Sequence, residues 1–460
     1  LLGFGAKASL VPFHTWLPKA HPVAPAPASA ILSAILTKTG MMGMIVVVCD
    51  IMFPSLSFGR LVLMLGTVTM VLGGILALAA NELKRTLACS TMSQIGFITV
   101  GLSLCILLGE ENAVAMSGTF LHMINHTLFK ISLFCLAGVV IKQTGTGDLN
   151  EIKGFGRGKI LLHIGFLLGA MGISGVPGLN GYISKTLLHE ALVELESPVF
   201  EWLFLISGGL TLAYMLKLYI VLFWERAEGE AKPVKLTVFT WFPCLLPALC
   251  YPFLGLFPNM VMDKLADYGR AFFYAAGTEG HIRYFSIENV KGSLISIAIG
   301  IVLYLAVVRV FQRRKQAEGV LYRQGLPGWL DLEKMLYRPV LLRVLPCIGT
   351  FFSRILDWFV DGTVLLLRRT IYRDNSTEEK PVYGGRLIDI LGECMNVLRN
   401  FWNLTFGRRH PVQKNYVVAF AGYKKKISLY GEMLSKSVSF GLLMFAFGFV
   451  LTIAYLIYLI

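Results

Sequence analysis

Long apolar stretches limit what this chain can fold into. Each of the strongest has about 20 residues, the length at which a helix crosses a hydrocarbon core of roughly 30 Å. Four of them are Leu61–Ala80, Leu236–Leu256, Leu294–Phe311 and Phe440–Ile460. Only 15% of the residues are charged, whereas an average soluble domain has about 25%. The sequence therefore predicts an all-α, polytopic helical membrane protein.

Hydropathy places one partial helix and nine spans along the chain, and one of the spans is interrupted. The partial helix comes first. The sequence opens without a methionine and inside an already apolar helix, so we expect further helices to precede Leu1 or to lie on another chain. The predicted segments are 1–17, 27–49, 61–80, 87–109, 113–141, 160–195 (interrupted), 201–224, 237–257, 288–312 and 437–459.

The segment 313–436 differs from the spans because it is more polar and basic. Within it, Pro339–Tyr372 and Leu387–Leu404 carry apolar residues at helical spacing. Amphipathic helices of this kind rest in the membrane interface or strap across neighbouring spans. We expect such a strap, and a small cytoplasmic helical domain is the alternative.

The net charge of +14 follows membrane topology rather than nucleic-acid binding. Lys and Arg fall in short loops and in segment 313–436, which is typical of cytoplasmic loops and of contact with lipid headgroups. If that segment is cytoplasmic, ten basic residues of the other loops lie on the same side and four on the opposite side. The four are Arg60, Lys264, Arg270 and Arg283. The positive-inside rule thus supports the predicted spans.

Neither the cysteines nor the glycines form a cofactor motif. No two of the eight cysteines have CxxC spacing, so we expect no iron–sulfur or zinc site within this chain. The Gly-rich stretches Gly3–Gly5 and Gly154–Gly158 do not follow a predicted strand, as a nucleotide-binding loop would. The sequence therefore predicts no cofactor and no metal.

Ionisable residues within predicted spans need a reason, because a charge at the centre of an inserted helix costs roughly 2.5–3.5 kcal/mol. Lys38 lies about midway along its span. His122, His126 and Lys130 recur at every fourth residue and so share one helix face. Imidazole exchanges protons near neutral pH, and burial disfavours the charged form of an amine. This face favours a proton relay. A hydrogen-bonded structural core is one alternative, and a zinc site is another, disfavoured because Lys130 would repel the cation.

Lys185 follows a glycine- and proline-rich run, Gly172–Ser184, in the middle of a span. Such a run cannot continue a regular helix, and non-helical backbone at membrane depth is buried in protein or lines a water-filled cavity. Discontinuous helices mark ion or substrate sites in transporters. Lys7, five residues before Pro12, has the same character. The predicted relay of buried groups, without acid partners, consists of Lys7, Lys38, His122, His126, Lys130 and Lys185.

Two further residues, Lys217 and His163, are weaker relay candidates. Lys217 lies within a span and fits a structural role as well as a relay role. His163 fits a packed core histidine better than a relay member, and we expect His14 near the surface.

The motifs around these residues resemble the antiporter-like subunits of respiratory complex I, which recur in energy-converting membrane hydrogenases and in multisubunit cation/proton antiporters. The run Gly5–His21 resembles their seventh-helix motif, Lys38 their eighth-helix lysine, and Leu83–Ser90 their tenth-helix signature. Further matches are His122, His126 and Lys130 in the eleventh helix and Lys185 in the broken twelfth helix. The resemblance covers roughly residues 1–225.

This resemblance implies two inverted five-helix repeats, each forming half a channel, with the first repeat truncated. Lys7 and Lys38 would belong to the first half-channel, and Lys130 and Lys185 to the second. The family pairs the seventh-helix lysine with a glutamate that lies before the first residue of this sequence. The implied domains are the rest of the first repeat (1–50), the second repeat (51–225), additional helices (226–312), a cytoplasmic-side amphipathic lateral-helix region (313–436) and a terminal membrane anchor (437–460).

The resemblance also implies a function. We expect a proton-translocating subunit, with Na⁺ as the alternative ion, in a redox-driven complex: an energy-converting hydrogenase of group 4, slightly favoured, or a complex I-like enzyme. The Fe–S, NiFe or flavin centres would lie on peripheral partner subunits, and no redox chemistry is expected in this chain. Other membrane subunits and lipids would be its partners in the inner (cytoplasmic) membrane of a prokaryote. The alternatives are a subunit of a multisubunit Na⁺/H⁺ antiporter, a stand-alone secondary solute transporter and a purely structural anchor.

Overall fold

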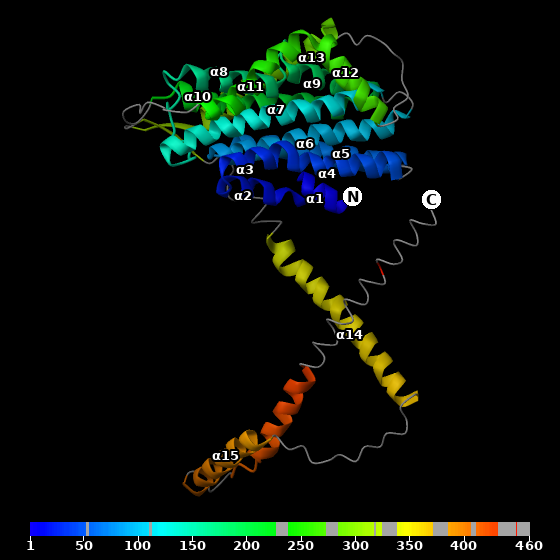
Figure 1. Ribbon diagram of the computed structural model, residues 1–460, viewed down its shortest axis with the longest axis vertical. Coiled ribbons are helices and arrows are strands. Elements are labelled where there is room, and N and C mark those ends of the chain that lie inside the picture. Colours follow the sequence, from blue (N-terminus) through cyan, green and yellow to red (C-terminus); the bar gives the residue numbers. More distant parts are fainter. Residues whose placement is uncertain are drawn as a thin grey trace. The chain divides into compact units, whose positions relative to one another are not determined.

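The computed structural model describes most of the chain as helices. The described residues are 1–51, 55–109, 113–226, 238–272, 284–316, 319–323, 338–370, 385–405, 411–430 and Gly448. They belong to two compact units, Leu1–Arg343 (unit 1) and Val344–Ile460 (unit 2). In unit 1 the labelled helices follow chain order from α1–α4 at one edge, through α5–α7, to α8–α13 at the other (Figure 1).

Short helices form the first 51 residues. The first of them ends where Ser9 adopts a left-handed conformation with φ of 69°, so the predicted helix over 1–17 is interrupted beside Lys7. From Ala26 to Cys49 the chain forms one continuous span, as predicted. The elements are α1 (Leu2–Ala8), η1 (Phe13–Thr15), α2 (Trp16–Val23), α3 (Ala26–Ile31), η2 (Leu32–Leu36), α4 (Thr37–Val46) and η3 (Val47–Ile51).

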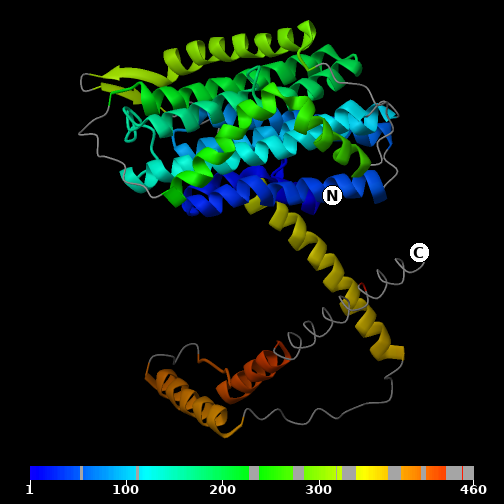
Figure 2. The same cartoon turned by 45° about the horizontal axis from the view of Figure 1, so that its top comes forward.

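Three long helices form the middle of unit 1 (Figure 2). Two of them approach each other closely at glycines: a Cβ atom on Gly96 would lie 2.3 Å from the Met70 backbone nitrogen. Small residues allow membrane helices to pack backbone against backbone. As a result α6 is buried along nearly its whole length, and its polar residues face protein rather than lipid. The helices are α5 (Leu56–Ala79), α6 (Leu83–Leu107) and α7 (Ala113–Thr144).

The predicted interruption of the span 160–195 is confirmed. The first half ends at Gly175, whose φ of 81° is a left-handed conformation that glycine adopts without strain. The second half begins after Leu179, and Gly181 in its first turn lies against the Gly172 carbonyl. The elements here are α8 (Ile160–Ser174), α9 (Asn180–Glu194) and the following span α10 (Pro198–Phe223).

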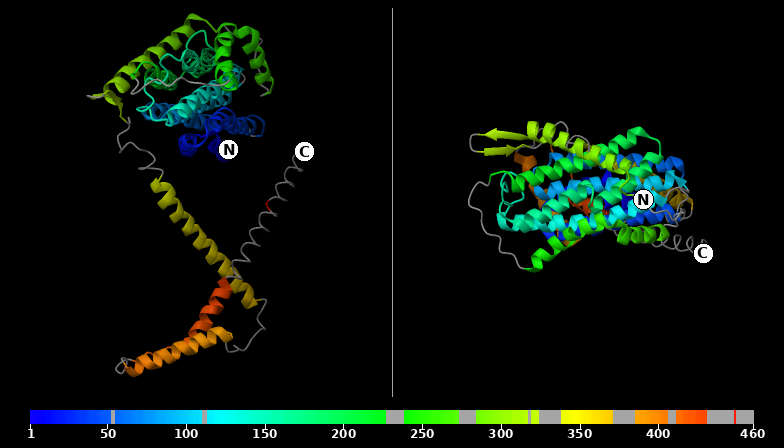
Figure 3. Two further views of the ribbon diagram at one scale, coloured as in Figure 1. Left: turned by 60° about the vertical axis from the view of Figure 1, so that its left-hand side comes forward. Right: turned by 90° about the horizontal axis from the view of Figure 1, so that it is seen from above.

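The rest of unit 1 contains two features that the sequence did not predict. The predicted span 237–257 bends by 96° into a second helix. After the span 288–312, a two-stranded antiparallel hairpin pairs Arg313 with Tyr322 and lies at one end of unit 1 (Figure 3). The elements are α11 (Val238–Leu256), α12 (Pro258–Phe272), α13 (Ile287–Leu303), η5 (Tyr304–Gln312), β1 (Arg313–Gln316) and β2 (Gly319–Tyr322).

Six of the described helices are long and apolar enough to cross a membrane, or up to seven if the bent pair Trp241–Leu256 and Pro258–Ala271 is one span. The six agree with the predicted spans 27–49, 61–80, 87–109, 113–141, 201–224 and 288–312. The chain is therefore an all-α polytopic membrane protein. The predicted span 437–459 lies outside the described residues, apart from Gly448.

The described part of unit 2 contains amphipathic helices, as the sequence predicts for Pro339–Tyr372 and Leu387–Leu404. Large apolar side chains are exposed along α14 (Leu345–Thr370), including Phe352 and Phe359. In α15 (Arg386–Thr405), Gly392 packs against the Val417 backbone of the helix at 416–430. The choice between a membrane strap and a cytoplasmic domain stays a prediction.

Candidate functional site

The predicted face of α7 is buried in the centre of unit 1. His122 is 1% exposed, and His126 and Lys130 are fully buried. The structure therefore confirms that these three side chains share a protein-facing side of one helix. Their neighbours come from α6, α9 and the N-terminal span.

His122 joins three helices through both of its ring nitrogens. Nδ1 lies 3.0 Å from the Ser184 hydroxyl of α9, and Nε2 lies 3.0 Å from Oε1 of Gln94 in α6. One turn away, Asn125 and Asn180 exchange hydrogen bonds: Asn125 donates to the Asn180 carbonyl at 2.8 Å, and Asn180 donates to Asn125 Oδ1 at 2.8 Å. The start of the second half-helix is thus held against α7.

His126 has a different environment. Neither ring nitrogen has a hydrogen-bond partner among the described residues. The ring interacts electrostatically with Lys38, Lys130 and His122. A buried imidazole without a fixed partner is costly as a structural element, but it is free to exchange protons through water.

The two lysines nearest His126 donate to groups on different helices. Lys130 donates to the Leu87 carbonyl at 2.8 Å and to the Ser90 hydroxyl, both in α6. Lys38 donates to the Ser33 carbonyl of its own span at 2.6 Å and is buried. Among the described residues no carboxylate forms an ion pair with either amine.

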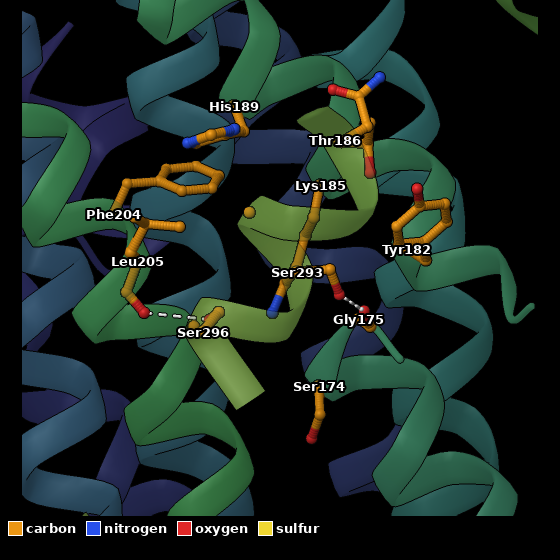
Figure 4. Close-up of a pocket in the computed structure, with 13 residues that line it drawn as sticks. Ser174, Gly175, Tyr182, Lys185, Thr186, His189, Phe204, Leu205, Ser293 and Ser296 are labelled. Carbon is orange, nitrogen blue, oxygen red and sulfur yellow. Dashed lines mark hydrogen bonds between the residues drawn. The ribbon is translucent and has the colours of Figure 1, made fainter. Parts of the chain in front are cut away.

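Lys185 follows the helix break and borders a cavity of about 30 Å³ between α9, α10 and α13 (Figure 4). Its amine has no hydrogen-bond partner among the described residues and lies 4.8 Å from the centre of the Phe97 ring. A cavity of this volume holds about two water molecules. This agrees with the prediction that the broken helix borders water-accessible space.

Two expectations about burial are wrong. Lys7 is exposed on the surface of unit 1, because α1 lies at one edge of that unit (Figure 1). His14, expected near the surface, is buried, because η1 folds back beneath α1 and Ser9 donates to the His14 carbonyl.

The two weaker candidates have fixed partners. The Lys217 amine lies within 3.2 Å of four oxygens, on Leu78, Ala80, Asn81 and Gln312. His163 Nε2 lies 2.5 Å from the Tyr219 hydroxyl. These contacts fit the structural alternative for both residues.

The sequence reading missed several polar residues of the site. Gln94 and Ser90 belong to the polar run Ser90–Gln94 inside an otherwise apolar span, a signal that was available. The sequence gives no comparable signal for His21. This residue is fully buried, has no hydrogen-bond partner on either ring nitrogen among the described residues, and stacks on Phe134 with ring centroids 4.6 Å apart. Within the described part of the chain, no three His, Cys, Asp or Glu residues are grouped as a metal site would require.

A bundle of membrane helices, one of them broken beside a buried lysine, with imidazoles and amines at its centre, is the arrangement that the sequence predicts for an antiporter-like membrane protein. Residues 1–211 match the family described as NADH:quinone oxidoreductase/Mrp antiporter, TM, so this part of the chain is similar to that family. The resemblance inferred from the motifs is confirmed.

Individual relatives come from several complexes. The chain is 32% identical over 292 residues to Hydrogenase-4 component B of Escherichia coli, covering 59% of this chain and 43% of that protein. It is 33% identical over 277 residues to NAD(P)H-quinone oxidoreductase chain 4 1 of Picosynechococcus, covering 56% and 50%. A chain of respiratory complex I from Thermus thermophilus has a similar fold, with a TM-score of 0.52 and 26% identity over 60% of this chain and 58% of that one. The chain thus spans half or less of the length of these two sequence relatives.

Proposed function

We propose that this chain is a proton-translocating membrane subunit of a redox-driven multisubunit complex, of the hydrogenase or complex I-like kind. The observation that carries the proposal is the buried set around α7, where imidazoles and amines from separate helices meet without acid partners among the described residues. The names of the relatives, a hydrogenase component and a quinone oxidoreductase chain, support it.

The contacts suggest an order for the relay. Lys38 and Lys130 both lie in electrostatic range of His126, which would pass protons between them through water. His122 is in electrostatic range of Lys185 and is linked to it along α9 through Ser184. In this proposal Lys185 is the last buried amine of the path, next to a cavity that can hold water. Lys7 would join the relay only where another segment covers its exposed side.

The chemistry of the set favours H⁺ over Na⁺. Hard cations are bound by several oxygen ligands, commonly carboxylates and carbonyls. The buried relay positions instead provide three amines and two imidazoles, which hold and release protons. Redox centres would lie on partner subunits, and we place the complex in the cytoplasmic membrane of a prokaryote.

Replacing Lys130 or Lys38 by Ala tests the proposal. In membrane vesicles that carry the assembled complex, we expect either variant to reduce proton uptake at least about 100-fold, the scale on which a positioned acid–base group contributes. Lys142→Ala is the matched control, since Lys142 is exposed near the end of the same helix. Unchanged uptake in both Lys130→Ala and Lys38→Ala would refute the proposal.

A Na⁺/H⁺ antiporter complex is the second candidate, because the matching family description includes Mrp antiporters. Purification of the native complex separates the two. A co-purifying nickel–iron or flavin-containing subunit supports the redox-driven complex, whereas only small membrane subunits support the antiporter.

A further inference from the structure

The cavity beside Lys185 is shared with a second titratable side chain that the proposed relay does not use. His189 lies one helical turn beyond Lys185 on α9, and both line this cavity (Figure 4). Residues four apart on a helix lie on the same face. Both side chains therefore border the same small volume, which water can occupy.

On its other side, His189 reaches a carboxylate. Its Nε2 lies 3.4 Å from Oε1 of Glu201 in the first turn of α10. Exposure to solvent increases from Lys185 through His189 to Glu201. The Lys185 amine is buried, the His189 side chain is 15% exposed, and the Glu201 side chain is 36% exposed. The three groups thus lead from the buried centre of the bundle to solvent.

The packing of α13 against α9 and α10 narrows the route from Lys185 through His189 to Glu201. Ser293 donates to the Gly175 carbonyl at 2.9 Å, and Ser296 donates to the Leu205 carbonyl at 3.0 Å, so α13 is fastened to both sides of the cavity. A Cβ atom on Gly292 would lie 3.1 Å from the His189 ring. Glycine at this position therefore leaves room for the imidazole.

The direction of the route follows from the charges of the loops. No Lys or Arg occurs between residues 186 and 216, whereas the loop between α7 and α8 carries Lys153, Arg157 and Lys159. By the positive-inside rule, the α7–α8 loop is cytoplasmic. The junction of α9 and α10, where Glu201 lies, is then on the opposite side of the membrane.

We propose that His189 and Glu201 form the outlet through which protons leave Lys185 for the non-cytoplasmic side; this rests on the proposed function. The Lys185 ammonium gives a proton to a cavity water as that water gives one to the His189 imidazole. The imidazolium passes a proton from Nε2 to the Glu201 carboxylate, which releases it to bulk water. Glu201 then returns to its starting state, and His189 does so once its remaining proton moves back from Nδ1 to Nε2. Lys185 is left as the neutral amine and takes its next proton from the relay.

Substitutions of His189 and of Glu201 test this outlet in vesicles that carry the assembled complex. His189→Gln keeps a side chain that can hydrogen-bond Glu201 but removes proton exchange, and we expect proton uptake to fall at least about tenfold, within the range for acid–base groups. Glu201→Gln should cause a smaller loss, because its exposed position lets water take the proton directly. Glu196→Gln is the control, an exposed carboxylate of the same junction, and should leave uptake unchanged.

A chemical rescue separates a relay role of His189 from a structural one. In His189→Ala, imidazole added to the medium should restore uptake, since it replaces the exchanging group without repairing the fold. Wild-type uptake in His189→Gln, alongside loss in Lys185→Ala, would overturn the outlet alone, and so would a loss in His189→Ala that imidazole leaves unrestored. Unchanged uptake in Lys185→Ala would instead overturn the proposed function and the outlet with it.

Discussion

Buried lysines in this protein differ in the number of oxygens around the amine, and that difference separates their roles. Lys217 is surrounded by four oxygens, two of them backbone carbonyls at the end of α5. A cation there satisfies carbonyls that the helix itself leaves without donors. The Lys185 amine has no such acceptor among the described residues. The first arrangement holds a charge in place, and the second allows it to leave.

Replacing each of these two lysines by methionine and measuring the stability of the variants tests this contrast. Lys217→Met removes a donor from four buried oxygens, of which the Leu78 carbonyl keeps a hydrogen bond from the Gln312 amide. One buried oxygen left without a donor costs about 1–3 kcal/mol, so we expect the free energy of unfolding to fall by at least about 3 kcal/mol. Lys185→Met removes an amine without hydrogen bonds from a buried site and should leave stability unchanged or slightly raised. Unfolding in detergent by heat or denaturant measures both. Equal destabilisation of the two variants would contradict this assignment.

At the residue scale, periodicity predicted the site well where one helix carries it. The spacing of His122, His126 and Lys130 was sufficient, because helical geometry places every fourth residue on one face. Partners from other helices, such as Gln94 and Ser184, depend on tertiary packing that spacing within one helix does not show. The exposure of Lys7 could not be predicted for the same reason. Whether a lysine beside a helix break is buried or exposed depends on the positions of the neighbouring helices.

At the scale of elements, the break between α8 and α9 depends on close backbone contact. An ideal Cβ atom on Gly181 would lie 1.9 Å from the Gly172 carbonyl oxygen. No side chain fits there without separating the two half-helices. The break thus follows from packing as well as from the local conformations of Gly175 and Gly178, both with positive φ.

A Gly181→Ala substitution should therefore destabilise the protein by about 3 kcal/mol, the upper part of the usual range for an overpacked site. It should also reduce proton uptake, because Lys185 lies one turn further along α9. Gly3→Ala is the matched control, since no atom lies within 4 Å of a Cβ at that helical position. Wild-type stability of Gly181→Ala would show that the half-helices are not held by this contact.

Element boundaries were predictable where hydropathy alone decides them, and less so where packing intervenes. The span over 56–79 was recognised from its apolar length. The bend between α11 and α12 was not, although Pro258 opens the second helix, because the apolar run ends at the same place. The hairpin was missed because Lys153 and Asn81, which donate to its Val320 and Tyr322 carbonyls, come from distant loops.

On the scale of the whole molecule, both units expose large apolar side chains, in different patterns. Unit 1 exposes them on the outward faces of its helices, for example at Leu61 and Met64 of α5, as a lipid-facing surface requires. In unit 2, α14 carries them together with the charged residues Arg354 and Asp357. Such a helix fits the boundary between lipid and water rather than the membrane interior.

The position of α14 relative to the membrane is open to a direct test. Residues two apart on a helix point about 200° apart, so Phe352 and Arg354 face nearly opposite sides. In a cysteine-free background reconstituted in lipid vesicles, Arg354→Cys should react quickly with a water-soluble maleimide, and Phe352→Cys should react only after detergent is added. This result is expected if the apolar face lies in the membrane interface or against other spans. Rapid labelling at both positions would instead favour a cytoplasmic helical domain, because both side chains are exposed within unit 2.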